Sequence, residues 1–137
     1  MDKSDLNVVT GHIVDAAYKL HQTLGPGLLE SVYEAILARD LERREMAVAR
    51  QIPLSFTYDG MFFHEALRID LMIEGKIIVE IKSVEKLVHV HSKQLLTYLR
   101  LLNLPVGLLI NFGAPTLKEG LRRVANGWTA PRLPELE

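Results

Sequence analysis

The sequence predicts an α/β protein with a mixed β-sheet flanked by helices, in the order α-α-β-β-β-α-β. Three observations predict this class. Apolar residues recur at helical spacing in two N-terminal segments, apolar and polar residues alternate in the middle, and a further helical segment separates the last two predicted strands. A helix between two strands usually returns the chain parallel to its start, whereas tight hairpins are antiparallel, so we expect a mixed sheet.

Two amphipathic helices are predicted at the start of the chain, over about residues 5–24 and 28–45. Ser4 or Asp5 is suited to cap the first helix, and the run Gly25-Pro26-Gly27 would end it. We expect the inner face of the second helix to be formed by apolar residues at helical spacing, which are Leu29, Val32, Tyr33, Ile36, Leu37 and Leu41. Both helices therefore have an apolar face to bury against a sheet.

The middle of the chain predicts three strands in a meander, because apolar and polar residues alternate there. The first strand spans 48–58, and the pair Asp59-Gly60 that follows it is a strong hairpin turn signal. The second strand begins at about Met61 and continues into a tight hairpin over 68–82, which reads RIDLMIEGKIIVEIK. The other predicted elements are arranged around this last hairpin.

The hairpin over 68–82 has a predicted register that brings charged residues together. A loop of Glu74, Gly75 and Lys76 would pair Ile73 with Ile77 and leave one buried face, formed by Ile69, Leu71, Ile73, Ile77, Val79 and Ile81. The other face then carries Asp70, Met72, Ile78, Glu80 and Lys82. In this register Asp70 lies opposite Glu80, at a Cβ separation of roughly 4.5 to 5.5 Å.

The remainder of the chain predicts one helix and one buried strand, over about 89–103 and 106–112. The segment 117–124 is ambiguous between a helix and an edge strand, and the tail from Asn126, which contains two prolines, is expected to be irregular. Because the chain shows no internal repeat or linker, residues 1–137 predict a single domain whose core spans about 5–124.

Composition limits the classes of function. The 137 residues include no cysteine, which fits a reducing cytoplasm and provides neither a disulfide nor a cysteine-bound zinc site. The opening residues contain acidic side chains and no long apolar core, so we expect neither a secretory signal nor a membrane span. A formal net charge of -1 provides no global attraction for nucleic acid, so any attraction to a polyanion must be local.

Asp70, Glu80 and Lys82 have the residue types that metal-assisted hydrolysis of a phosphodiester requires. Carboxylate oxygens bind Mg²⁺ or Mn²⁺, which stabilises developing negative charge and lowers the pKa of a bound water. Lys82 is suited to orient that water or to neutralise the transition state, and Glu30 to complete the metal shell directly or through water. The structural alternatives are a solvated sheet face for the hairpin and, for Glu30, a carboxylate favoured at a helix start. Two apolar side chains on the charged face favour half-burial, where charges persist only when they are paired or metal-bound.

The sequence resembles the GxxExxY protein family over nearly its whole length, from about Val14 to Phe112. The pattern that names the family is present at 27–33 as GLLESVY, and the surrounding text also matches, as KLHQTLGPGLLESVYE, RQIPLSFTYDG, RIDLMIEGKIIVEIKSVEKL, QLLTYLRLLN and GLLINFG. That family is placed in the PD-(D/E)XK nuclease superfamily, so the resemblance implies a restriction-endonuclease-like fold and a metal-dependent nuclease. The superfamily signature, an aspartate on one strand and an acid-x-lysine on the next, corresponds to Asp70, Glu80 and Lys82.

The same resemblance implies roles for four further residues. Gln94 and Tyr98 match the QxxxY motif of the RecB-like branch, which contacts the nucleic acid or supports the site. His21 corresponds to an upstream histidine that can bind metal in that branch, although a histidine near a helix end is also often a cap or a buried hydrogen-bonding residue. Tyr33 is expected to pack in the core with its hydroxyl near the site.

Two functions follow as hypotheses, and a third possibility is a purely structural homo-oligomer in which exposed strand residues form an interface. The first is a cytoplasmic nuclease that depends on Mg²⁺ or Mn²⁺ and acts on DNA or RNA. The second is a module of the same fold that binds nucleic acid or a partner protein without catalysis, which the near-neutral charge and the small surface favour. A homodimer, which is common in the superfamily, would offer two sites to a duplex, and no membrane partner is expected.

Overall fold

A computed structural model describes residues 1–127 of the chain. In this range the elements are α1 (Leu6–Leu24), α2 (Glu30–Arg43), β1 (Val48–Tyr58), β2 (Met61–Ile73), β3 (Ile77–Lys82), α3 (His89–Leu102), β4 (Val106–Asn111), α4 (Leu117–Gly120) and β5 (Leu121–Ala125). The five strands of this range form one sheet in the order β1-β2-β3-β4-β5, in which β3 and β4 pair in parallel and the other neighbours are antiparallel. The structure therefore confirms the predicted α/β class with a mixed sheet and flanking helices. No helix in the described range is long and apolar enough to cross a membrane.

The segment 117–124, which was ambiguous from its sequence, forms both of the structures considered. Thr116 caps the short helix α4 by accepting a hydrogen bond from the Glu119 N–H, and β5 follows at once as the strand beside β4. The end of the chain was expected to be irregular from Asn126, and residues 128–137 of that prediction lie outside the described residues.

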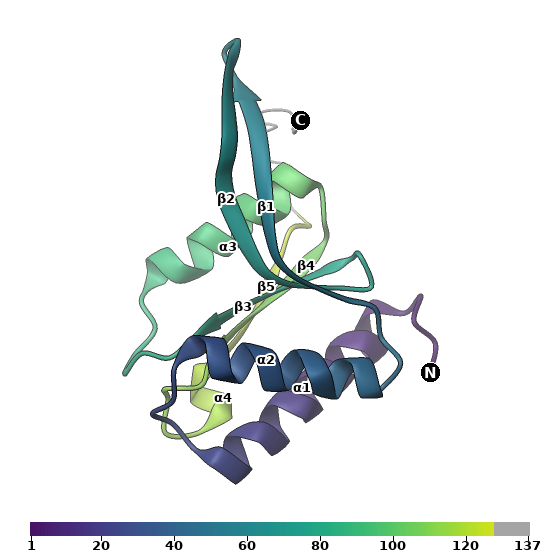
Figure 1. Ribbon diagram of the computed structural model, residues 1–137, viewed down its shortest axis with the longest axis vertical. Coiled ribbons are helices and arrows are strands. Elements are labelled where there is room, and N and C mark those ends of the chain that lie inside the picture. The colour runs from purple at the N-terminus through teal and green to yellow at the C-terminus, as the bar shows by residue number, and fades with distance from the viewer. Residues whose placement is uncertain (128–137) are drawn as a thin grey trace.

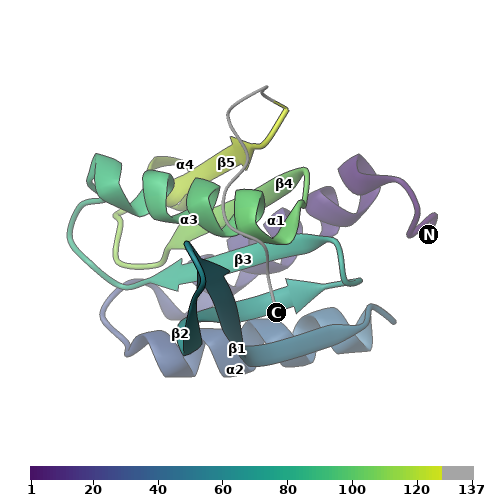
Figure 2. The ribbon, with the colours of Figure 1, turned by 90° about the horizontal axis from the view of Figure 1, so that it is seen from above.

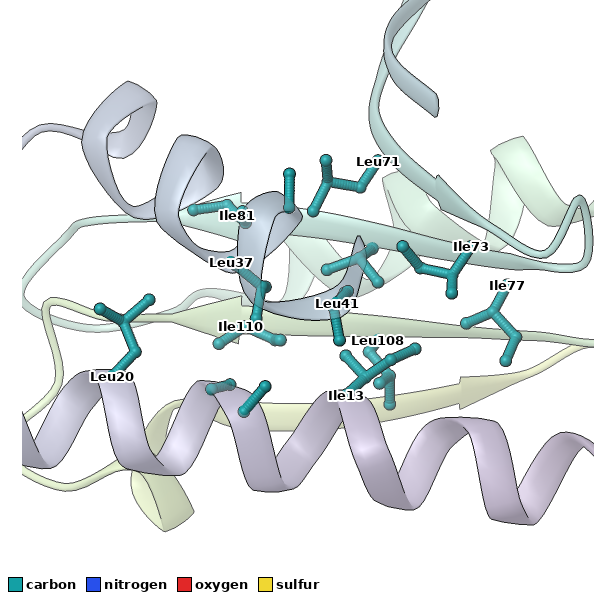
Figure 3. Close-up of a cluster of buried hydrophobic side chains, with 14 of the residues drawn as sticks. Ile13, Leu20, Leu37, Leu41, Leu71, Ile73, Ile77, Ile81, Leu108 and Ile110 are labelled. Carbon is teal, nitrogen blue, oxygen red and sulfur yellow. The ribbon is translucent and has the colours of Figure 1, made fainter. Parts of the chain in front are cut away.

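Helices cover both faces of the sheet, with α1 and α2 on one side and α3 on the other (Figure 1). Seen from above, β2, β3, β4 and β5 follow one another across the sheet, and α3 lies over the part formed by β3, β4 and β5 (Figure 2). Figure 3 shows Ile13 of α1 and Leu37 and Leu41 of α2 pointing toward apolar side chains of the sheet. A smaller cluster beneath α3 contains Ile69, Ile78, Leu95, Leu99 and Leu109. Burial on both faces explains why β4 hardly alternates in polarity.

The predicted inner face of α2 is partly wrong. The side chain of Leu29 lies just before the helix and is 74% exposed, and Val32 is 38% exposed. The helix begins at Glu30 rather than at Leu28, and each residue turns by about 100° around its axis. The fully buried face is therefore a row spaced by four residues, which leaves Val32 at its edge and consists of Tyr33, Leu37 and Leu41.

The hairpin of β2 and β3 has the predicted register near its turn. Ile73 lies opposite Ile77, the pairing extends to Leu71, and Gly75 in the turn has a φ of 63°. Beyond this point β2 bends away from β3 and continues with β1 as a long hairpin that projects from the body (Figure 1). The predicted position of Ile69 is wrong, because its side chain packs in the cluster beneath α3 and not with Leu71. The bend in β2 interrupts the alternation on which that prediction rested.

Tyr33 ties the loop between α1 and α2 to the core. Its hydroxyl donates to the Gly25 carbonyl oxygen at 2.5 Å and accepts from the Leu28 N–H at 3.2 Å. Its ring stacks on Phe112 with the ring centroids 4.4 Å apart, and its side chain is fully buried. One side chain therefore fixes both the packing of α2 and the path of the loop that precedes it.

Tyr33→Phe is expected to lower the free energy of unfolding by about 1 to 2 kcal/mol, because the ring stays packed while the two backbone groups lose their partner. Urea unfolding followed by circular dichroism measures this change. Tyr18→Phe is the matched control, since the Tyr18 hydroxyl hydrogen-bonds the exposed side chain of Gln22, and we expect a change within about 0.5 kcal/mol. Equal losses in the two variants would contradict this role of Tyr33.

Candidate active site

Asp70 and Glu80 meet in the gap where β2 leaves β3. The Asp70 N–H donates to Glu80 Oε1 at 3.3 Å, and the Ile81 N–H donates to Asp70 Oδ2 at 2.8 Å. The regular pairing of β2 with β3 ends at Leu71 and Val79, so at Asp70 and Ile81 side chains satisfy backbone N–H groups that a continuous ladder would pair. The structure brings the two carboxyl groups together, as the hairpin register predicted.

The surroundings of Asp70 and Glu80 disfavour a negative charge on both carboxyl groups at once. The pKa of the Glu80 carboxyl is raised to about 9, first by burial and then by the charge of Asp70 and a hydrogen bond with its side chain, against the lowering effects of the Asp70 N–H and of Lys82. Only 6% of Glu80 is exposed. The pKa of Tyr98 is also raised, first by burial and then by the charges of Glu80 and Asp70. Without a cation, Glu80 is therefore protonated at neutral pH, and Tyr98 lies within electrostatic reach of the pair.

Glu30 and Asp70 line one open cavity of about 840 Å³. Glu30 begins α2, and its Oε1 accepts a hydrogen bond from the Ser83 N–H at 3.2 Å, while Ser83 Oγ donates to the Leu28 carbonyl oxygen at 2.7 Å. These two bonds tie the end of β3 to the start of α2. Glu30 is thus held beside the strand that carries Glu80, as expected, and it lies on the same cavity as Asp70.

The remaining residues of the predicted site lie on β3 and α3. Lys82 is half-buried and alternates with Glu80 along β3, and its charge acts on the Glu80 carboxyl. Tyr98 packs against the apolar cluster beneath α3, and Gln94, one turn earlier in α3, is exposed. Gln94 and Tyr98 therefore share one side of α3. Of the two, Tyr98 is the residue whose pKa is raised by the charges of Glu80 and Asp70.

His21 lies in the core instead of on the cavity. Its Nε2 is 2.8 Å from the Ala114 carbonyl oxygen, and its ring lies 6.5 Å from that of Phe112. Because a carbonyl oxygen only accepts, Nε2 carries the proton in this contact and has no lone pair for a metal ion. This geometry supports the alternative considered for His21, a buried hydrogen-bonding residue. Tyr33, on the same stack of rings, uses its hydroxyl on the α1–α2 loop.

Sequence reasoning missed Glu34, Arg50 and Gln51, which line the same cavity. Glu34 is buried in α2 and receives hydrogen bonds from the other two side chains. One signal pointed to Glu34, because it stands four residues after Glu30 and so shares its helix face. No sequence signal pointed to Gln51, whose side-chain direction depends on a left-handed backbone within β1.

The donor atoms at the site suit a hard divalent cation. Asp70 and Glu80 supply carboxyl oxygens, and a cation between them would offset the burial and the charge repulsion that together keep Glu80 protonated. Within residues 1–127 no three Asp, Glu or His side chains converge closely enough to hold a metal ion. Since Mg²⁺ commonly takes one or two carboxylates and keeps several waters, the pair fits this ion with Glu30 beyond direct contact.

A mixed sheet with an acidic pair and a lysine on adjacent central strands is the architecture of a nuclease-like α/β domain. The chain belongs to the PD-(D/E)XK nuclease superfamily, whose family model matches residues 7–124. This match and the observed sheet confirm the restriction-endonuclease-like fold. No curated protein and no solved structure shows significant similarity to the chain.

Proposed function

We propose that this protein is a Mg²⁺- or Mn²⁺-dependent nuclease that hydrolyses phosphodiester bonds of DNA or RNA. The observation that carries the proposal is the pair of adjacent carboxyl groups, Asp70 and Glu80, in a gap whose second strand also carries Lys82. Membership of the nuclease superfamily supports the reaction class. In this proposal, a bound cation compensates the second negative charge, which the buried surroundings of the two carboxyl groups otherwise disfavour.

The side chains around the gap have complementary roles in the proposed reaction. A divalent cation, when bound, supplies positive charge to the phosphate oxygens and lowers the pKa of the attacking water. Asp70 and Glu80 would hold the cation, and Glu30, which lines the same cavity as Asp70, would act on it through a bridging water. The Lys82 ammonium orients the attacking water or neutralises charge on the phosphate.

We infer that nucleic acid reaches the acids along the side of α3 that carries Gln94 and Tyr98. Tyr98 is half-buried beside the acidic pair, and Gln94 is exposed one turn away. A phenol and an amide contact sugar and phosphate groups without reading a particular base. Several expectations from the sequence stay predictions. They are membership of the GxxExxY family and the RecB-like branch, a cytoplasmic location, a homodimer, a single domain over 1–137 and a metal-binding role for His21.

Cleavage of labelled single- and double-stranded DNA and RNA tests the proposal directly. We expect product with Mn²⁺ or Mg²⁺ and none with EDTA. Lys82→Ala should lower the initial rate by about 100- to 1,000-fold at saturating metal, because it removes a preorganised charge from the phosphate. Lys76→Ala, at the exposed turn of the same hairpin, is the matched control and should cleave at the wild-type rate.

The outcomes separate the two hypotheses. Equal rates for wild type and Lys82→Ala would remove Lys82 from the mechanism. Binding of nucleic acid by the wild type, with no cleavage of any substrate in either metal, would instead support a binding module of the same fold.

A further inference from the structure

The amide of Gln51 lies between two carboxyl groups. Its Nε2 is 2.5 Å from Glu34 Oε1 and 3.4 Å from Asp70 Oδ1. An amide nitrogen carries two hydrogens, and a carboxylate can only accept, so one hydrogen is available to each acid. The opposite amide orientation would place an oxygen against both acids. Gln51 thus links the buried acid of α2 to the proposed metal-binding acid of β2.

The backbone of β1 is distorted where this contact forms. Neighbouring residues of a strand normally point to opposite faces, yet Arg50 and Gln51 both reach Glu34. Gln51 has a φ of 49°, in the left-handed region that a non-glycine residue rarely adopts inside a strand. The regular pairs of β1 with β2 lie at Arg50 and Ile52, on either side of it. Strain of this kind persists where surrounding contacts impose it, and it occurs often at functional sites.

Glu34 anchors the arrangement from α2. Its side chain is 7% exposed, and its Oε2 receives hydrogen bonds from Arg50 Nε at 3.2 Å and Arg50 Nη2 at 3.0 Å. Oε1 remains for the Gln51 amide. Because both Glu34 oxygens are engaged, the carboxyl group cannot rotate without breaking contacts, and the Gln51 amide is fixed in turn.

Asp70 is therefore held from two directions. Gln51 Nε2 approaches Oδ1, and the Ile81 N–H binds Oδ2 at 2.8 Å. Each carboxylate oxygen has two lone pairs, so one on each oxygen is left beside these contacts, and a cation would replace the hydrogen bond that Asp70 accepts from protonated Glu80. Groups that hydrogen-bond a metal ligand orient it, and their loss typically costs about 10- to 100-fold in metal affinity or activity.

We propose that Gln51 is a positioning residue that orients the Asp70 carboxylate for a divalent cation, with Glu34 as its anchor. This inference rests on the proposed function of Asp70 as a metal ligand. In this proposal, the strained residue Gln51 orients the Asp70 carboxylate, and Asp70, Glu80 and Lys82 take part in the reaction.

Direct Mn²⁺ binding, measured by the electron paramagnetic resonance of free Mn²⁺, tests the proposal without requiring turnover. Gln51→Ala should raise the Kd for Mn²⁺ by about 10- to 100-fold. Gln22→Ala, which changes an exposed glutamine of α1, should leave the Kd unchanged. Both variants are first compared with wild type by thermal unfolding in EDTA, and binding is measured well below the unfolding transition. A Kd of Gln51→Ala within twofold of wild type overturns the proposal.

A double variant separates orientation of Asp70 from simple stability. Glu34→Gln combined with Gln51→Glu keeps an amide and a carboxylate between α2 and β1, but it places a carboxylate beside Asp70. We expect this double variant to recover stability relative to Gln51→Glu alone, while its Kd for Mn²⁺ does not return to the wild-type value. Recovery of both would overturn the proposal.

The result for Gln51 is distinguishable from a failure of the nuclease proposal. A wild-type protein that binds Mn²⁺ and cleaves nothing overturns the proposed function, while the Kd of Gln51→Ala still decides the positioning role. A wild-type protein that cleaves, with an unchanged Kd in Gln51→Ala, overturns the positioning role alone. A wild-type protein that binds no Mn²⁺ overturns both.

Discussion

Asp70→Asn is expected to lower metal-dependent cleavage by about 1,000-fold or more. The amide keeps the size of the side chain but has no negative charge for the cation, and the electrostatic contribution of a catalytic metal amounts to several kcal/mol. The carbonyl oxygen of the new side chain can still accept from the Ile81 N–H, so the fold should persist. Initial rates at saturating Mn²⁺ measure the loss.

The same variant should also lose its stabilisation by metal. A ligand that binds only the folded state raises the free energy of unfolding by about 2.7 kcal/mol when its concentration is one hundred times its Kd. We expect Mn²⁺ to raise the melting temperature of wild type and to leave that of Asp70→Asn unchanged.

Asp59→Asn is the matched control for Asp70→Asn, because it makes the same chemical change in the exposed turn between β1 and β2, where an asparagine tolerates the φ of 50°. It should keep both cleavage and stabilisation by Mn²⁺. Cleavage by Asp70→Asn at the wild-type rate would exclude Asp70 as a metal ligand.

Glu80→Gln is expected to stabilise the metal-free protein while abolishing cleavage. Burial, followed by the charge and hydrogen bond of Asp70, raises the pKa of the Glu80 carboxyl to about 9, against an ordinary value of 4.5. At pH 7 the folded protein therefore holds a proton on Glu80 that the unfolded chain has released. Glutamine resembles the protonated acid and carries no such penalty, so the gain at pH 7 should be about 3 kcal/mol, at about 1.4 kcal/mol for each pH unit between 4.5 and 7.

The pH dependence follows from the same shift. The folded-state pKa is raised, so the stabilisation from Glu80 is fully present below about pH 4.5 and is lost as the pH rises toward 9. In EDTA, the advantage of Glu80→Gln over wild type should grow between pH 5 and pH 9, at up to about 1.4 kcal/mol per pH unit. Urea unfolding at several pH values measures this slope.

Glu85→Gln, at an exposed position shortly after β3, is the control for Glu80→Gln. Its stability should follow wild type within about 0.5 kcal/mol at every pH. A Glu80→Gln curve parallel to that of wild type would show that Glu80 is ionised in the metal-free protein. Retained cleavage would exclude it as a metal ligand.

Local patterns in the sequence were sufficient for most of the fold. The strand β1 has its predicted bounds, Asp5 caps α1, and the three-residue turn sets the Ile73–Ile77 register. Each of these depends on neighbours along the chain, through alternation, capping or turn chemistry. The same register placed Asp70 beside Glu80, so the acidic pair was predictable before the fold was known.

Other features of the site depend on contacts between distant segments. Glu34 could have been noticed only as a neighbour of Glu30 on its helix, and its burial depends on β1 packing against α2. Ile69 was placed on the wrong face because nothing in its local alternation indicates that β2 bends just before Leu71.

The sequence by itself determined the mixed α/β class, the hairpin register and the meeting of Asp70 with Glu80, because these follow from periodicity over a few residues. Only the tertiary structure decided how the pair is surrounded. The divergence of β2 from β3 opens the gap, burial of Glu80 raises its pKa, and a left-handed residue in β1 brings Gln51 to Asp70. Burial and side-chain direction at a strained residue are set by the whole surroundings, which no local pattern encodes.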